Sequence, residues 1–118
     1  MPPNDNQPVV LFGLYRWAGT TPEEFRAHYL DHHVGIGKRI PGVAWYYAFL
    51  NTDPQRDGNS APRPDAFAVM CFESADAFAQ LSTTAEWAEA VADNVGFISH
   101  FDTYPVERVT LVPERPAS

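Results

Sequence analysis

The amino-acid sequence predicts a single α+β domain of the ferredoxin-like type, with the order β-α-β-β-α-β and a four-stranded antiparallel sheet. The chain has 118 residues, which is enough for one domain and one core. Apolar runs and helix-start signals follow one another in that order along the sequence. Two helical regions are present, enough to cover one face of such a sheet. The domain is predicted over residues 9–112, with an extended or disordered tail at 1–8 and a second tail at 113–118.

The first strand and the first helix have the clearest local signals. Residues 9–17 are apolar or aromatic at almost every position, which is typical of a strand. Thr21 is a suitable N-cap, Pro22 suits the first helical position, and Glu24 completes a capping box. Pro41-Gly42 is expected to end this helical segment.

Two further strands are predicted at residues 43–50 and 66–72, because both runs are apolar and rich in aromatic or β-branched residues. Residues 51–64 between them contain Asp, Asn, Gly, Pro and Arg, a composition typical of a long exposed loop.

The second helical region is expected to begin after the cap Ser74 and to run to Asn94, with a break at Thr83-Thr84. The last strand is predicted over residues 101–112. Pro105 lacks a backbone N–H, so it indicates an edge strand or a bulge.

The predicted strands are apolar on both faces, although two helices can cover only one. An antiparallel sheet with one face in water should alternate apolar and polar residues. A large bare apolar surface is not tolerated on a soluble monomer. The pattern therefore predicts a homodimer in which two sheets pack face to face around a two-fold axis.

Composition excludes several classes of partner. The net charge is −7 and the pI about 4.8, so the chain repels phosphate backbones and anionic lipids, and neither nucleic acid nor membrane is expected as a partner. No apolar run approaches the roughly 20 residues of a membrane span. Cys71 is the single cysteine, and residues 1–8 lack the features of a signal peptide. A cytoplasmic location is therefore predicted.

Several motifs, taken in order, are similar to those of the EthD family of dimeric α/β barrels. The resemblance extends from about Val10 to Leu111 and is carried by five features: Thr21-Pro22-Glu23-Glu24-Phe25 followed by His28-Tyr29, His33, Pro41-Gly42 leading to Tyr46-Tyr47, Phe72-Glu73-Ser74 with Glu86-Trp87, and His100-Phe101-Asp102.

This resemblance implies a sheet-on-sheet dimer with a pocket between the sheet and the helices of each subunit. Relatives in this family include proteins of ether degradation, methylmuconolactone isomerases, and polyketide cyclases or dehydratases. Only His33 falls on the family's recurrent helix histidine. The strand cysteine of the isomerases has no clear counterpart at Cys71, so that role is not carried over.

His33 is the first candidate catalytic residue. It lies on the apolar stripe of the helix, so its imidazole should face the sheet, and an ordinary histidine pKa of about 6.5 suits general acid–base work near neutral pH. The alternative is a structural histidine that bonds a carbonyl group or caps the helix. His100 is the second candidate, expected to face His33 across the pocket with Asp102 or a backbone carbonyl fixing its tautomer. The alternative for His100 is an exposed turn residue.

A ring-lined pocket would suit a small hydrophobic or aromatic ligand. The candidate substrate-binding residues are Tyr29, His32, Trp45, Tyr47, Trp87 and Phe97. Strand alternation puts Trp45 and Tyr47 on one face and Tyr46 on the other. Each ring has an alternative role in the core or in the dimer interface.

His28 and His32 stand one helical turn apart, as metal-binding histidines do, but no cysteine or carboxylate stands at a matching spacing, so no metal site is predicted. The sequence contains no phosphate-binding loop, dinucleotide fingerprint or haem-attachment motif, and no cofactor is expected.

The predicted function is therefore a cofactor-independent acid–base enzyme of the cyclase, dehydratase or isomerase type. One alternative is a non-catalytic binding or accessory protein of a degradation pathway. Another is a cofactor-free or haem-associated monooxygenase.

Overall fold

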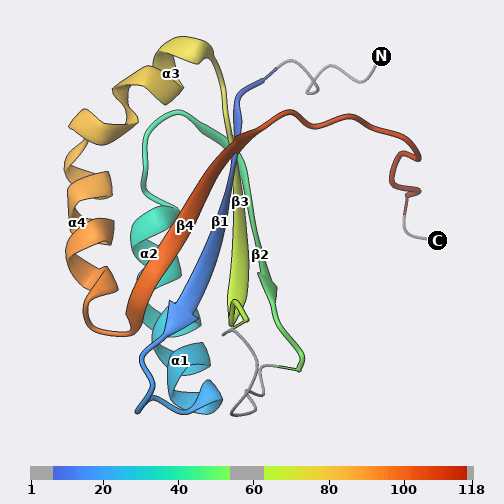
Figure 1. Cartoon of the computed structure of the whole chain (residues 1–118). Coiled ribbons are helices and arrows are strands. Elements are labelled where there is room, and N and C mark those ends of the chain that lie inside the picture. Colours follow the sequence, from blue (N-terminus) through green and yellow to red (C-terminus); the bar gives the residue numbers. More distant parts are fainter. Residues whose placement is uncertain (1–6, 54–62, 117–118) are drawn as a thin grey trace.

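A computed structural model describes residues 7–53 and 63–116 and shows one four-stranded antiparallel sheet (Figure 1). The strand order is β2-β3-β1-β4, which is the ferredoxin-like arrangement predicted from the sequence. The strands are β1 (Val9–Arg16), β2 (Val43–Leu50), β3 (Ala66–Phe72) and β4 (Ile98–Val106). Most of the predicted N-terminal tail and of the loop after β2 lies outside the described residues.

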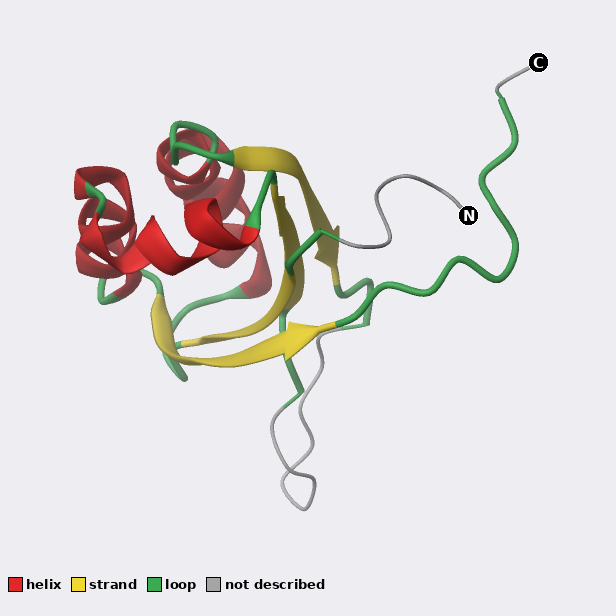
Figure 2. Cartoon of the chain, turned by 90° about the horizontal axis from the view of Figure 1, so that it is seen from above, coloured by secondary structure: helices red, strands yellow, loops and turns green. Residues whose placement is uncertain are grey.

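The helices form two segments that lie on the same face of the sheet (Figure 2). The first consists of α1 (Pro22–His28), a π-helical turn η2 (Tyr29–His33) and α2 (Val34–Gly37). The second consists of α3 (Ala75–Gln80), a 3₁₀ turn η3 (Leu81–Thr83) and α4 (Ala85–Asn94). Among the described residues, no helix combines the length and apolar character that crossing a membrane requires.

The predicted helix starts are confirmed in atomic detail. The Glu24 backbone N–H donates to the Thr21 hydroxyl at 3.1 Å, and the Thr21 backbone N–H donates to the Glu24 carboxylate at 3.0 Å. Pro22 occupies the first helical position. Ser74 caps α3, and the predicted break before α4 occurs at η3. Local sequence chemistry therefore fixes where these helices begin.

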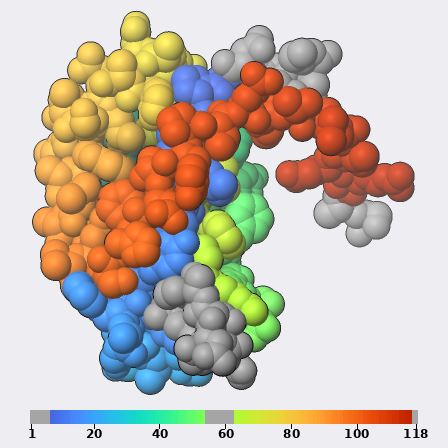
Figure 3. Space-filling view, in the orientation of Figure 1, coloured from blue at the N-terminus to red at the C-terminus, as the bar shows by residue number. Residues whose placement is uncertain are grey.

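The last strand differs from the prediction of 101–112, since β4 covers residues 98–106. Its start lies earlier because Ile98 pairs with Arg16, the last residue of β1, across a register shift. Its end lies earlier because Val106 pairs with Val9, where β1 begins, so the following residues have no strand of their own sheet to pair with. That segment projects away from the body (Figure 3). Pro105 lies on an edge strand, as predicted.

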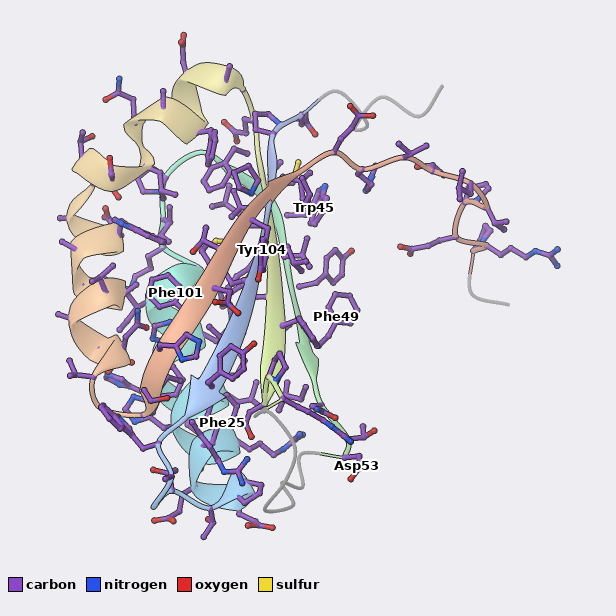
Figure 4. The ribbon with its side chains drawn as sticks, in the orientation of Figure 1. Phe25, Trp45, Phe49, Asp53, Phe101 and Tyr104 are labelled. Carbon is purple, nitrogen blue, oxygen red and sulfur yellow. The ribbon has the colours of Figure 1, made fainter. Side chains whose placement is uncertain are left out.

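Side chains alternate between two unlike faces of the sheet. The face under the helices carries the buried core, which includes Phe12, Leu14, Ala68, Met70 and Phe72. The outer face carries large apolar side chains with 37–56 % of their surface exposed: Tyr47, Phe49, Phe67, Tyr104 and Val106. Trp45 and Phe49 point away from the helices, whereas Phe101 points toward them (Figure 4).

Candidate functional site

A cavity lies between the helix-covered face of the sheet and the two helical segments. Strands contribute Phe12, Tyr46 and Phe101, and the helices contribute Tyr29, His33, Trp87, Val91 and Asn94. The cavity measures about 50 Å³, room for a few water molecules. Val91 is 42 % exposed and also lines the cavity, so it marks the side that faces solvent.

His33 lies in the wall of this cavity and is held by Asp93 of α4. Its Nδ1 lies 2.8 Å from Asp93 Oδ2, and 12 % of each side chain is exposed. A carboxylate can only accept a hydrogen bond, so Nδ1 carries the proton when the ring is neutral. The lone pair of the neutral ring is then on Nε2, the nitrogen that is not bonded to Asp93. This is the arrangement that a histidine general base requires.

The π-helical turn η2 explains how one aspartate contacts several histidines. The Val34 N–H donates to the carbonyl of Tyr29, five residues earlier, so the turn holds one residue more than an α-helical turn. His28 and His33, also five residues apart, therefore lie on the same side of the helix. Both rings reach Asp93 Oδ2, at 2.9 Å for His28 and 2.8 Å for His33.

Burial and the neighbouring charges act in opposite directions on the site. Burial lowers the pKa of His33, the Asp93 carboxylate offsets only part of that effect, and His28 and His32 add to the lowering. Partial burial by itself would raise the pKa of Asp93. Hydrogen bonds from His28 and His33 outweigh burial and hold the pKa of Asp93 below its usual value. At neutral pH the pair is therefore a neutral imidazole and a carboxylate.

Among the described residues, one group has the composition of a metal site. One ligand atom from each of His28, His32 and Asp93 lies within 4.8 Å of the others. Imidazole nitrogen and carboxylate oxygen are common zinc ligands. Sequence spacing did not indicate Asp93 as a partner. In the structure, these atoms already pair with one another at 2.9–3.1 Å. The absence of a metal site stays a prediction.

Three of the predicted aromatic residues surround the site. Tyr29 and Trp87 line the cavity. Phe97 is 1 % exposed and packs behind the site, with its ring centroid 4.8 Å from that of His33. Phe97 therefore supports the histidine from the core and does not line the cavity. Whether any of these residues binds a substrate stays a prediction.

Trp45 and Tyr47 do not line the cavity, which corrects the expected pocket lining. Both belong to β2 and project from the outer face, where their ring centroids lie 5.5 Å apart. Tyr46, between them, points the other way and lines the cavity. The predicted alternation is confirmed, but the face with the single aromatic residue is the pocket face.

His32 and His100 also lie outside the cavity. The His32 side chain is 61 % exposed and pairs with Asp93 Oδ1 at 3.1 Å. His100 belongs to β4 and not to a turn, and its ring stacks on Tyr15 at 4.2 Å on the outer face. Its Nε2 lies 3.7 Å from Asp102 Oδ1. This distance is too long for a hydrogen bond, so Asp102 does not fix the tautomer of His100 as expected, and the sheet separates His100 from His33.

Sequence reasoning missed Asp93 and the pocket role of Tyr46. Asp93 stands on a helix that also carries exposed Glu89, so its carboxylate has no local feature that distinguishes it. The available signal was long-range, because three histidines near one helix end need an acceptor from a neighbouring element. For Tyr46, the signal was the alternation of β2 combined with the position of the helices.

Comparison with known proteins gives a consistent result for the fold. The family model of the EthD domain matches residues 18–100. Among curated proteins, no significant match is found.

Solved structures with the same fold share little sequence with this chain. An ethyl tert-butyl ether d (EthD) family protein from Bacillus halodurans has 17% identity and a TM-score of 0.68, covering 86% of this chain and 99% of its own. A dimeric ferredoxin-like protein of unknown function from Thermobifida fusca has 15% identity and a TM-score of 0.63, covering 86% and 92%. A protein from Bacteroides thetaiotaomicron, named as a candidate antibiotic biosynthesis monooxygenase, has 16% identity and a TM-score of 0.59, covering 98% and 99%.

Proposed function

Since the chain belongs to the EthD family, we propose that it is a cofactor-independent enzyme that moves a proton on a small, flat, apolar ketone or related compound. The observation that carries this proposal is the His33–Asp93 pair in the wall of an apolar cavity, with Nδ1 and Oδ2 2.8 Å apart. A neutral imidazole whose tautomer is fixed by a carboxylate is a competent general base.

The proposed reaction needs no group beyond those of the chain and the substrate. His33 Nε2 takes a proton from the carbon next to the carbonyl group. The electron pair of the broken C–H bond forms a C=C bond, and the carbonyl π pair moves to oxygen. In a β,γ-unsaturated ketone, the carbonyl group then re-forms, the double bond shifts to the α,β position, and the imidazolium returns the proton to the γ-carbon. In a β-hydroxy ketone, the carbonyl group re-forms, the α,β double bond forms as the C–O bond breaks, and the departing hydroxyl group takes the proton and leaves as water. Asp93 stabilises the imidazolium through the Nδ1–H bond throughout.

The size of the cavity restricts the substrate. About 50 Å³ is roughly a third of the ~150 Å³ of a cavity that binds benzene, so even a compact ring ketone requires Trp87 or Val91 to move. Most of the lining is apolar or aromatic, which favours a substrate with one polar end.

The outer face supports a second part of the proposal, namely that the working unit is a homodimer. Tyr47 and Phe49 are 52 % and 56 % exposed, which is unusual for clustered rings on a monomer. A second copy of the same face is the simplest partner, and the similar Thermobifida fusca protein is described as dimeric.

The test is exchange of the α-protons of 2-indanone in D₂O, followed by proton NMR after subtraction of the uncatalysed rate. We expect His33→Gln to slow exchange by roughly 100- to 10,000-fold, the usual contribution of a general base. His100→Gln should keep the wild-type rate, because that ring lies on the opposite face. Equal rates in wild type and His33→Gln would refute the proposal. Binding of 2-indanone without exchange would favour the accessory-protein alternative.

A further inference from the structure

The hydroxyl group of Tyr29 is a buried polar atom that is poorly satisfied by the described part of the chain. Tyr29 is 0 % exposed, and its Oη makes no hydrogen bond of ordinary geometry with the described residues. Buried polar groups are almost always paired, so an unpaired one calls for an explanation. Phenylalanine would fill the same space without leaving a polar atom unpaired. The hydroxyl group of Tyr46 lies near enough to interact with that of Tyr29. Two phenols that pair with each other still keep one O–H for an acceptor that is not part of the chain.

The position of Tyr29 shows where that partner would be. Tyr29 lines the cavity and precedes His33 by one helical turn, and the two ring centroids are 6.0 Å apart. The other sides of the tyrosine ring pack against Phe25 and Phe97 at 5.7 and 6.0 Å. This packing fixes the ring, so its hydroxyl group has one orientation relative to His33.

Tyr46 brings a second phenol to the same cavity from β2. Its hydroxyl end lies over Gly37, where a methyl group on Gly37 would stand 3.3 Å from the Tyr46 oxygen. Gly37 thus provides the space that the Tyr46 ring occupies. The cavity is therefore lined by Tyr29 and His33 from one helical segment and by Tyr46 from β2.

Both phenols remain protonated at neutral pH. Burial raises the pKa of Tyr29 above its ordinary value, and the charge interaction and hydrogen bond with the neighbouring Tyr46 phenol add to this effect. Burial also raises the pKa of Tyr46, although the hydroxyl group of Tyr29 partly opposes the rise. Protonated phenols can donate hydrogen bonds into the cavity, and the best acceptor for them is an oxygen atom with partial or full negative charge.

We infer that Tyr29, assisted by Tyr46, forms a binding subsite for the oxygen atom of a ketone or enolate, beside the proton-transfer position of His33. The inference rests on the proposed function for the role of His33 but makes a separate statement about binding. The Tyr29 O–H donates to the carbonyl oxygen in the bound ketone. When the α-proton moves to His33 Nε2, the same bond stabilises the charge that develops on that oxygen.

A matched pair of one-ring probes tests this subsite. 4-Fluoroacetophenone carries a carbonyl oxygen, and 4-fluoro-α-methylstyrene carries a CH₂ group in the same place. Fluorine NMR titration gives the dissociation constant of each. We expect Tyr29→Phe to weaken binding of the ketone by roughly tenfold and to leave binding of the styrene within about twofold of wild type. Tyr104→Phe, on the outer face, should change neither constant.

Several outcomes would contradict the inference. Equal ketone affinity in wild type and Tyr29→Phe would show that the hydroxyl group has another partner, such as an ordered water molecule. Equal loss for both probes would show that the substitution disturbs packing. If Tyr29→Phe does not fold, Tyr46→Phe is measured in its place, and unchanged selectivity for the ketone over the styrene would again overturn the subsite.

The same titration separates this inference from the proposed function. His33→Gln should bind the ketone as wild type does and yet fail to exchange its protons. Unchanged ketone binding in Tyr29→Phe together with lost exchange in His33→Gln would leave the enzyme proposal standing and remove only the subsite. Retained exchange in His33→Gln with weakened ketone binding in Tyr29→Phe would refute the enzyme proposal and leave Tyr29 as part of a binding site for the ketone oxygen.

Discussion

The two faces of the sheet have similar hydrophobicity in the sequence but different surroundings in the structure. On the inner face, helices cover the strands, and a small cavity with His33 in its wall lies between them. On the outer face, Trp45, Tyr47 and Phe49 form an aromatic row that none of the described helices covers (Figure 4). The comparison shows that strand hydrophobicity identifies surfaces that need a cover, whereas the helices decide which of them becomes a site.

The polar side chains of the two faces differ more in their surroundings than the apolar side chains do. The inner face places Tyr29 and His33 in a cavity where burial shifts the pKa of each group. On the outer face, His100 stacks on Tyr15 and is largely exposed. Chemistry is therefore expected on the inner face and association on the outer face. Each prediction below tests one side of this division.

The largest effect is expected from a charge placed on the outer face. Phe49→Asp would bury an unpaired carboxylate between two sheets, at a cost of about 3 kcal/mol or more. The dissociation constant of the dimer should therefore rise by roughly 100-fold. Sedimentation velocity across a concentration series measures this change. Val95→Asp, at a 69 % exposed apolar position beyond α4, is the control and should leave the dimer intact. A wild-type chain that sediments as a 13.2 kDa monomer would contradict the assignment of association to the outer face.

The next largest effect is expected from Asp93→Asn on the inner face. This change removes the charge that fixes the tautomer of His33, so 2-indanone exchange should slow by roughly 10- to 100-fold. Asp93 raises the pKa of His33, and its removal should also move the acid side of the pH–rate profile to lower pH. Asp93→Glu should recover part of the rate. A slower rate without any movement of the profile would indicate a purely structural role for Asp93.

The pH dependence of the wild-type protein gives a third and smaller effect. Neutral His33 is the active form, and burial, with smaller contributions from His28 and His32, lowers its pKa against the opposing action of Asp93. The exchange rate should therefore be constant near pH 7 and fall on the acid side with a midpoint below about 6.5. A midpoint above 6.5 would contradict the assignment of His33 as the base.

The smallest effect is expected from two glycines in one helix. A Cβ atom on Gly37 would lie 3.1 Å from the Tyr46 ring, whereas a Cβ atom on Gly35 would meet nothing within 4 Å. Gly37→Ala should displace Tyr46 and weaken binding of 4-fluoroacetophenone by about threefold. Gly35→Ala should leave binding unchanged and raise the unfolding free energy by up to ~1 kcal/mol, because alanine is the better helix former. Equal affinities in both variants would show that Tyr46 does not shape the cavity.

Much of the fold could be predicted because its signals are local. The caps Thr21 and Ser74 and the strands at 43–50 and 66–72 follow from adjacent residues, and the structure confirms them. The end of β4 could not be predicted, since its length is set by the length of β1 in the register of the sheet. Local composition contains no information about that register.

The site was predicted less completely because it depends on contacts between distant elements. His33 was placed in the cavity wall correctly from its position on the helix stripe. Asp93 was missed because it is 60 residues away in the sequence, and the π-helical turn that aligns His28 with His33 has no clear sequence signature. Trp45 and Tyr47 were assigned to the pocket because alternation separates two faces without saying which one the helices cover.

The most direct test of the central claim is the tautomer of His33, measured by long-range ¹H–¹⁵N correlation NMR on ¹⁵N-labelled protein at pH 7. His33→Gln identifies the signals of this ring. The account predicts a proton on Nδ1, bonded to Asp93, and an unprotonated Nε2. A proton on Nε2, in either the other neutral tautomer or the imidazolium, would contradict the account, because no lone pair would then be available to the cavity.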